Sequence, residues 1–257
     1  MIFNAAQLSE HLASSKKNGG VQPLTELIPQ LSVEEAYQVQ LKTISKQLAA
    51  GNKITGKKIG LTSTAMQDSL GVSEPDYGHL LDSMEIINGG KVQSKQVLQP
   101  RVEGEIAFVL KEALKGPKVT ALDVIQATDY ITPAIEIVDS RIKDWKLTLQ
   151  DTVGDNASSG LYVLGTKKFS LKEINLRLTG MALYKNGKLQ NTGAGAACLD
   201  NPINGVVWLA NKLAAYDIQL EKGEVILSGA LSAAIPAEEG DYFEIKFNQL
   251  GNVAVRF

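Results

Sequence analysis

Two glutamates stand one residue apart inside an apolar run, in "RVEGEIAFVL" at residues 101–110. Successive residues of a β-strand point to opposite faces, so a strand here would project Glu103 and Glu105 side by side, with Cα atoms roughly 7 Å apart. The apolar residues that follow predict that this strand is buried. Two buried carboxylates repel each other and are costly to remove from water, and a cation between them removes both costs. Because carboxylate oxygens favour hard ions, the pattern is typical of a Mg²⁺ or Mn²⁺ site.

A third ligand should come from another strand, and Glu136 in "PAIEIVD" is the best candidate, since Ile135 and Ile137 flank it in an alternating apolar run. Two alternatives stay open. The first is an edge strand with its acidic face in water, because most glutamates are exposed. The second is a carboxylate pair for glycoside hydrolysis, although such pairs usually come from separate elements that face each other across a sugar.

Other polar residues could act beside such a site. Lys57 and Lys58 lie between glycines in "TGKKIG", and strand alternation predicts that one of them points inward. An inward lysine could orient or protonate a substrate, whereas the alternative is a surface lysine. Asp76 in "SEPDYGHL" follows a proline, a position where aspartate also serves turns. Ser158 lies in the loop "DNASSG", which is either a polar lining or only a loop. His11, His79 and Cys198 carry no motif: these three residues are assigned no role.

Composition limits the class of protein. The chain has 257 residues, 44% hydrophobic and 21% charged, which is enough to bury a large core. A net charge of −2 provides no basic field for nucleic acid or an acidic membrane. The single cysteine excludes an internal disulfide framework and fits a reducing compartment. No apolar run approaches the ~20 residues of a membrane span, and "MIFNAAQLSEHLASS" lacks the pattern of a signal peptide. We therefore expect a cytoplasmic protein.

The elements that must position these residues form two parts. Residues 1–52 are expected to be a helical segment, because Ser32 and Glu35 form a capping box and Gly51 ends the pattern. Its predicted apolar stripe contains Tyr37, Leu41, Ile44 and Leu48. Residues 53–257 are expected to form a β-rich domain. The predicted fold class is therefore α+β and β-rich.

Within the second part, short strands are separated by glycines and a few helices. A helix is expected over Thr120–Tyr130, between the two acidic strands. Asn186–Gly187 suits a type I′ turn and predicts a hairpin. Asn201 and Pro202 begin another helix. The buried side of this helix is predicted to contain Val206, Leu209, Ala210 and Leu213.

Seven segments occur in the order of a known family. They are "KKIGLTS", "PDYG", "QPRVEGEIAFVL", "PAIEIVDSRIKDWK", "DTVGDNASSG", "NTGAGAA" and "GEVILSGAL". Together they resemble the 2-oxopent-4-enoate (2-hydroxypenta-2,4-dienoate) hydratases and the related 4-oxalocrotonate decarboxylases of the fumarylacetoacetate hydrolase superfamily. The resemblance runs from about residue 20 to the C-terminus. It implies a mixed β-roll, a divalent metal (Mg²⁺ or Mn²⁺), a homo-oligomer, and possible association with a sister enzyme of the pathway.

The resemblance also implies roles for individual residues. The metal ligands would be Glu103, Glu105 and Glu136. The catalytic residues would be Lys58, Asp76 and Ser158. The substrate would contact Leu61, Gly229 and Ala230, the last two through their backbone.

The implied enzyme is a lyase of aromatic meta-cleavage catabolism, and its substrate is a small 2-hydroxydienoate or 2-oxo acid. The hydratase reaction adds water to 2-hydroxypenta-2,4-dienoate and gives 4-hydroxy-2-oxopentanoate. Asp76 favours it, because the decarboxylases tend to have an apolar residue at that position, whereas "GALSAAIP" at residues 229–236 is closer to the decarboxylase form. A dicarboxylate hydratase acting on 2-oxohept-3-ene-1,7-dioate and a catalytically silent metal-binding scaffold also stay open.

Overall fold

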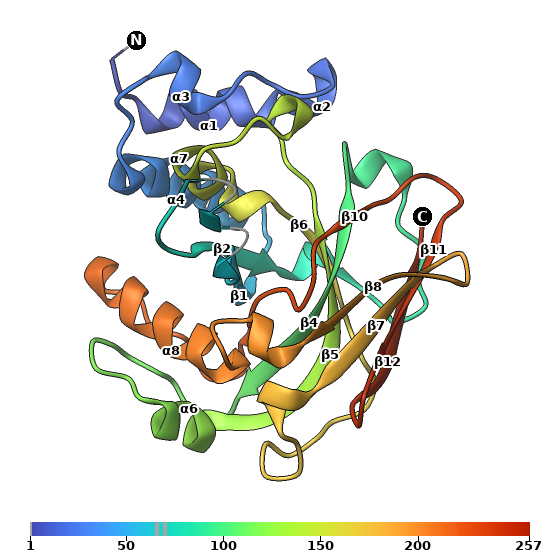
Figure 1. The fold of residues 1–257 in the computed structure, drawn as a ribbon. Coiled ribbons are helices and arrows are strands. Elements are labelled where there is room, and N and C mark those ends of the chain that lie inside the picture. Colours follow the sequence, from blue (N-terminus) through green and yellow to red (C-terminus); the bar gives the residue numbers. More distant parts are fainter. Residues whose placement is uncertain (1, 65–66, 69–70) are drawn as a thin grey trace.

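Two β-sheets and a group of N-terminal helices make up the computed structural model, which describes residues 2–64, 67–68 and 71–257 (Figure 1). The larger sheet is mixed, with the strand order β2-β1-β9-β4-β5-β6-β3 and β10 beside β4. The smaller sheet is antiparallel, with the order β12-β11-β7-β8. This arrangement confirms the expected α+β, β-rich architecture.

Among the described residues, the α-helices are α1 (Ala5–Ala13), α2 (Ser15–Asn18), α3 (Leu24–Leu27), α4 (Val33–Ala49), α6 (Ala121–Ala127), α7 (Leu149–Gly154) and α8 (Pro202–Leu213). The strands are β1 (Ile54–Gly60), β2 (Asp76–Leu81), β3 (Glu85–Ile86), β4 (Arg101–Leu110), β5 (Thr128–Val138), β6 (Ser159–Leu164), β7 (Gly180–Lys185), β8 (Lys188–Ala194), β9 (Val225–Leu227), β10 (Ile235–Pro236), β11 (Tyr242–Phe247) and β12 (Gly251–Arg256).

Helix α4 begins as its sequence predicts. The Ser32 hydroxyl accepts a hydrogen bond from the Glu35 N–H, and the Glu35 carboxylate accepts one from the Ser32 N–H, which completes the capping box. Tyr37 and Ile44 of the predicted stripe are buried, but Leu48 near the end of the helix is 43% exposed. The stripe is therefore shorter than predicted, because the last turn of α4 extends beyond the core.

A buried polar contact joins α4 to β2. The Gln40 amide nitrogen donates to the backbone oxygens of Tyr77 and Val153, at 3.0 and 2.6 Å. Its oxygen is thereby free to accept from His79 Nδ1, at 2.9 Å, which assigns the proton of the neutral ring to Nδ1. Burial, followed by the charge of Lys57, lowers the pKa of His79 to about 3. His79 is thus a neutral structural residue in the interface between α4 and the sheet.

Strand β4 belongs to the larger sheet and packs against the smaller one. Gly104 faces the smaller sheet, and a Cβ atom at this position would lie 2.5 Å from Met181 Sδ and 3.1 Å from the Ile245 side chain. Ile106 and Phe108, on the same face, are fully buried. Because adjacent residues of a strand point in opposite directions, this packing turns the two glutamates toward the other face of the larger sheet.

Two local predictions are confirmed and one is wrong in its length. Asn186 and Gly187 both have positive φ, at 53° and 75°, in the turn between β7 and β8. Asn201 caps α8, whose predicted inner side is buried. The helix expected over Thr120–Tyr130 ends at Ala127, because Thr128 and Tyr130 pair with β4 as the first residues of β5.

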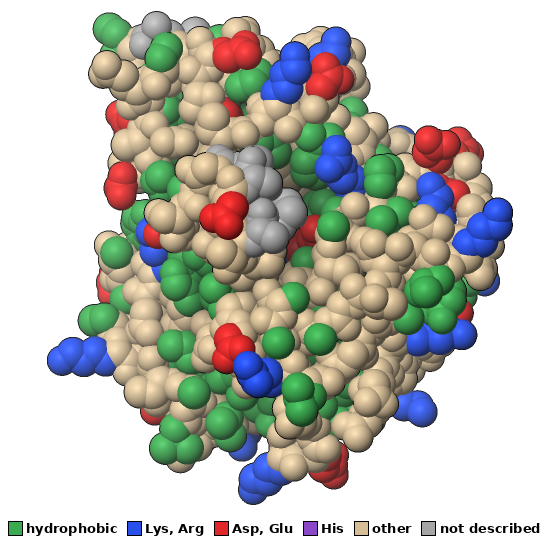
Figure 2. All heavy atoms as spheres, viewed as in Figure 1, with side chains coloured by type: hydrophobic (Ala, Val, Ile, Leu, Met, Phe, Trp, Pro, Cys, Tyr) green, Lys and Arg blue, Asp and Glu red, His purple; other side chains and the backbone are tan. Residues whose placement is uncertain are grey.

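Charged side chains of both signs are interspersed on the face of the molecule shown in Figure 2. In the part of the chain that the structure describes, no helix combines the length and the apolar character that a membrane crossing requires.

The burial of neutral His79 predicts a pH-dependent stability. The pKa of His79 in the folded protein lies below its value of about 6.5 in the unfolded chain. As the pH falls below about 6.5, the unfolded chain therefore binds a proton at His79 and the folded protein does not. Lowering the pH from 7 to 5 should therefore reduce the free energy of unfolding by about 2 kcal/mol through His79. In the variant His79→Asn, whose amide nitrogen can replace Nδ1, this component should be absent. Urea unfolding of both proteins at pH 7 and 5 measures the difference, and parallel losses in the two proteins would contradict it.

Candidate functional site

The three predicted metal ligands meet on one face of neighbouring strands. Glu103 on β4 is paired directly with Glu136 on β5, and Glu105 lies two residues further along the same face of β4. One carboxylate oxygen from each of the three lies within 4.8 Å of the others. Pairing between β4 and β5, which the sequence could not define, therefore places Glu136 beside the other two.

This cluster is not an acidic face in water. β4 lies inside the larger sheet, Glu105 and Glu136 are completely buried, and Glu103 is partly buried. All three carboxylates also lie on one face of two paired strands, whereas the carboxyl groups of a glycosidase face each other across a sugar. The geometry therefore favours a common ligand held by all three.

Buried oxygens of this cluster and of Asp76 have no hydrogen-bond partner among the described residues. They are Glu105 Oε1, Glu136 Oε2 and Asp76 Oδ1, while Glu136 Oε1 has only its ion pair with Lys58. Ser158 Oγ, in a turn that contacts β2, is also buried without a partner. Buried polar groups in native proteins are nearly always satisfied, so a group of unsatisfied oxygens is typical of a site whose ligand completes it. Oxygen donors of this kind, most of them anionic, match a Mg²⁺ or Mn²⁺ ion.

The electrostatics agree with this interpretation. Burial, followed by repulsion from Glu136, raises the pKa of Glu103 to about 8. Burial and the same neighbour raise the pKa of Glu105 well above its ordinary value. Burial also raises the pKa of Glu136, in spite of the Lys58 ammonium beside it. Ionising all three carboxylates here is therefore energetically unfavourable unless a further positive charge lies beside them.

Lys58 supplies one positive charge to the cluster. Its Nζ lies 3.2 Å from Glu136 Oε1. Burial alone would lower the lysine pKa, but the carboxylates of Glu136, Asp76 and both other glutamates outweigh burial, so the pKa is raised. Lys58 therefore carries an ammonium at neutral pH and acts as a hydrogen-bond donor or acid.

Lys57 corrects the expectation that only one of the two lysines points inward. Both are buried, on opposite faces of β1, because Lys57 has its own partner. Its Nζ lies 2.6 Å from both carboxylate oxygens of Glu224, which is also buried. The two lysines thus form separate ion pairs.

Asp76 reaches the cluster across a glycine. Asp76 and Gly60 are paired at the ends of β2 and β1. A Cβ atom on Gly60 would lie 2.2 Å from Asp76 Oδ1 and 3.2 Å from Lys58 Nζ, so both charged groups converge over the position where a side chain is missing. Asp76 is buried, which fits a residue that acts on a bound molecule better than one that serves a surface turn.

The segment after β9 closes the site through its backbone. The N–H of Gly229 donates to Glu105 Oε2 at 2.9 Å. Gly229 has a φ of 115°, and a Cβ there would meet the Thr62 side chain at 2.4 Å, so only glycine fits. Leu61 and Ala230 are the chain neighbours of Gly60 and Gly229; their contact with substrate stays a prediction.

Ser158 lies in a turn that contacts β2. Asn156, Ala157 and Ser158 all have left-handed backbone conformations, with φ between 50° and 56°. Such conformations cost about 1–2 kcal/mol for each non-glycine residue and are concentrated at functional sites. The Asn156 side chain accepts a hydrogen bond from the His79 N–H and donates one to the His79 carbonyl, at 2.7 and 2.9 Å. The turn is thus fixed to the strand that also carries Asp76.

The fold and the site geometry can be compared with known proteins. The model of the fumarylacetoacetate (FAA) hydrolase C-terminal family matches residues 72–257. The chain belongs to the fumarylacetoacetate hydrolase family. This membership confirms the family that the ordered sequence segments indicate.

Individual family members are similar over most of their length. The chain is 45% identical to a 2-hydroxyhexa-2,4-dienoate hydratase of Comamonas testosteroni. The alignment spans 237 residues, which are 91% of this chain and 90% of the relative. It is 51% identical over 200 residues to a 2-hydroxypent-2,4-dienoate hydratase of Pseudomonas putida. This alignment spans 77% of this chain and 90% of the relative. The structure of 4-oxalocrotonate decarboxylase from Pseudomonas putida G7, complexed with magnesium and adipate, matches with a TM-score of 0.95 at 37% identity, over 98% of this chain and 97% of that one. These named members of the family are lyases.

Sequence reasoning missed the groups that support the site. Gly60 and Thr62 leave no pattern that separates them from ordinary strand and loop residues. Arg141 and Asp155, which hold the turn that contains Ser158, lie 14 residues apart and share no motif spacing. Only the weak signal of an arginine inside "IVDSRI" could have suggested a buried ion pair.

The unsatisfied carboxylates predict a metal-dependent stability. Adding Mg²⁺ or Mn²⁺ should raise the thermal midpoint, since an ion that binds only the folded state stabilises it by about 2.7 kcal/mol at 100 times its dissociation constant. Glu136→Gln should abolish most of this shift, because it removes one anionic ligand. Thermal unfolding with and without each ion measures it.

Glu224→Gln is the matched control, because it changes a buried glutamate that lies outside the cluster and pairs with Lys57. This variant should keep the metal-dependent shift. An unchanged midpoint of the original protein at millimolar ion, or an equal shift in Glu136→Gln, would refute the metal site.

Proposed function

We propose that this chain is a metal-dependent hydratase that adds water to 2-hydroxypenta-2,4-dienoate, or a short homologue, and gives the corresponding 4-hydroxy-2-oxo acid. The observation that carries the proposal is the buried cluster of Glu103, Glu105 and Glu136 with Lys58 and Asp76 beside it. Relatives named as dienoate hydratases at 45% and 51% identity support the reaction class.

The cofactor would be a divalent cation held by Glu103, Glu105 and Glu136, and we propose Mg²⁺ or Mn²⁺. Family structures described with magnesium and with calcium support a hard cation. When bound, such an ion acts as a Lewis acid toward oxygens of a 2-oxo acid.

The reaction has two stages, and each of them requires proton transfers for which the chain provides groups. First the 2-hydroxyl loses a proton and C5 gains one, which gives an α,β-unsaturated 2-oxo acid. Then the oxygen of water bonds to C4 while C3 takes up a proton. Lys58, as an ammonium, can donate to substrate oxygen or supply a proton. Asp76, whose Oδ1 is buried and unsatisfied, can accept the proton of the attacking water, and Ser158 can hold the substrate carboxylate or a water.

Asp76 also favours hydration over decarboxylation. A decarboxylase must accept a second carboxylate at the distal end of its substrate, and a buried aspartate there would repel it. The alternative, 4-oxalocrotonate decarboxylase, is favoured by the TM-score of 0.95 with that enzyme and by the form of residues 229–236. The relatives include a 2-oxo-hept-4-ene-1,7-dioate hydratase of Escherichia coli at 42% identity, so a dicarboxylate substrate for hydration is a further test compound.

We also propose a cytoplasmic location, a homo-oligomeric state and possible association with a sister enzyme. A reduced, buried Cys198 supports the first of these. The other two follow from what the family resemblance implies.

Turnover of three substrates tests the proposed reaction. With a divalent ion present, the protein should consume 2-hydroxypenta-2,4-dienoate and form 4-hydroxy-2-oxopentanoate, and it should release no CO₂ from 2-oxohex-3-enedioate. Loss of dienol absorbance, product identification and CO₂ release are measured in parallel, with 2-oxohept-3-ene-1,7-dioate as the third substrate. Release of CO₂ without hydration would establish the decarboxylase instead.

The variant Asp76→Asn separates an enzyme from a metal-binding scaffold. Loss of the base should lower kcat by about 10²- to 10⁴-fold, while the metal-dependent thermal shift remains. Asp82→Asn, an exposed aspartate just after β2, should leave kcat unchanged. If Asp76→Asn retains full turnover, Asp76 is not the base.

A further inference from the structure

The turn at Asn156–Ser158 needs an external restraint. Three consecutive non-glycine residues in the left-handed region do not persist by local preference alone, because an extended or right-handed backbone suits each of them better. The Ser158 hydroxyl at the end of the turn is buried and has no partner in the described part of the chain. What holds the backbone of this turn therefore decides where that hydroxyl points.

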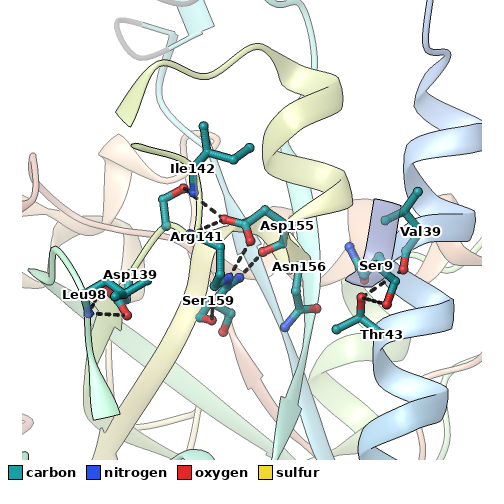
Figure 3. A network of polar contacts seen from close by, with 12 residues as sticks. Ser9, Val39, Thr43, Leu98, Asp139, Arg141, Ile142, Asp155, Asn156 and Ser159 are labelled. Atoms are coloured by element: carbon teal, nitrogen blue, oxygen red, sulfur yellow. Dashed lines mark hydrogen bonds and ion pairs between the residues drawn. The ribbon is translucent and has the colours of Figure 1, made fainter. Parts of the chain in front are cut away.

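One guanidinium spans the turn. Arg141 donates through Nε to Asp155 Oδ1 and through one terminal nitrogen to the Asp155 carbonyl. Its other terminal nitrogen donates to the Ser159 carbonyl at 2.8 Å. Asp155 and Ser159 are the residues immediately before and after the turn, so a single side chain fixes both of its ends (Figure 3).

The same cluster is tied to the strands that carry the metal ligands. The Asp155 carboxylate also accepts from Ser140 Oγ at 2.9 Å and from the Arg141 N–H at 3.0 Å. The Ser158 carbonyl accepts from the Asp139 N–H at 2.7 Å. Asp139 and Ser140 directly follow β5, the strand of Glu136.

Asp139 extends this connection to the segment that leads into β4. Its carboxylate accepts from the N–H groups of Leu98 and Gln99, at 2.7 to 3.0 Å. The two strands that carry the glutamates and the turn that carries Ser158 therefore share one polar network.

We propose that Arg141 and Asp155 are positioning residues for the reaction: together they clamp the left-handed turn so that the Ser158 hydroxyl is held at the substrate. The inference rests on the proposed function. Neither residue needs to touch substrate, because they act through the backbone of residues 156–158.

Lysine cannot replace the arginine in this role. The guanidinium presents five N–H donors in one plane, and three carbonyl or carboxylate oxygens are arranged around it here. An ammonium at the same place keeps the charge opposite Asp155 but loses the simultaneous contact with Ser159. Arg141→Lys thus separates the clamp from the ion pair.

The test is a double-variant cycle on kcat. Arg141→Lys should lower kcat for 2-hydroxypenta-2,4-dienoate by about 10- to 100-fold, which is the order of loss expected when a group is displaced by about 1 Å. The metal-dependent thermal shift should stay unchanged. If Arg141 acts through Ser158, the double variant Arg141→Lys/Ser158→Ala should be no slower than Ser158→Ala alone, whereas a merely structural role would give multiplied losses.

Two further variants keep the test decisive. Arg177→Lys is the matched control, since Arg177 pairs with Asp200 on the surface, and it should leave kcat unchanged alone and in the Ser158→Ala background. If Arg141→Lys does not fold, Asp155→Asn, which keeps the shape of its side chain, enters the same cycle.

The outcomes separate this inference from the function on which it rests. An original protein without dienoate turnover would overturn the proposed function and this role with it. An active original protein with unaffected kcat in Arg141→Lys, or with multiplied losses in the cycle, would overturn the clamp alone.

Discussion

The structure depends on the mutual repulsion of three carboxylates that share one buried place. Glu103, Glu105 and Glu136 cannot all ionise there against a single lysine without a large electrostatic cost. In a low-dielectric interior this repulsion is strong, and so is the attraction of a divalent cation for the same oxygens. The three carboxylates therefore need more positive charge beside them than the single ammonium of Lys58 supplies.

The surrounding elements hold the cluster against this repulsion. The smaller sheet packs behind β4 so closely that Gly104 has no room for a side chain, and this packing fixes the direction of the neighbouring glutamates. Gly60 and Gly229 allow Asp76 and a backbone N–H to approach from the other side. Two departures from local preference lie beside these residues: the positive φ of Leu61, next to Gly60, and the left-handed turn at residues 156–158, which contacts β2. Such departures are expected where function and not local stability selects the conformation.

Local signals in the sequence predicted the parts of the fold that local chemistry decides. The capping box at Ser32, the Asn186–Gly187 turn and the helix after Asn201 are interactions between residues a few positions apart. The pair Glu103 and Glu105 was readable for the same reason, because strand alternation is local. Glu136 was a candidate only, since its pairing with Glu103 is set by the register between β4 and β5.

The features that the sequence did not reveal depend on distant partners. Lys57 is buried because Glu224, 167 residues away, meets it. The helix expected up to Tyr130 is shorter because strand pairing competes for its last residues. The clamp around Ser158 joins two segments that leave no joint pattern in the sequence.

A crystal structure of the protein grown with Mn²⁺, with anomalous scattering measured at the manganese edge, tests the central claim most directly. The account predicts one strong anomalous peak bonded to an oxygen of each of Glu103, Glu105 and Glu136. A structure without a peak at these residues, or with the ion bound elsewhere while the three carboxylates stay unoccupied, would contradict it.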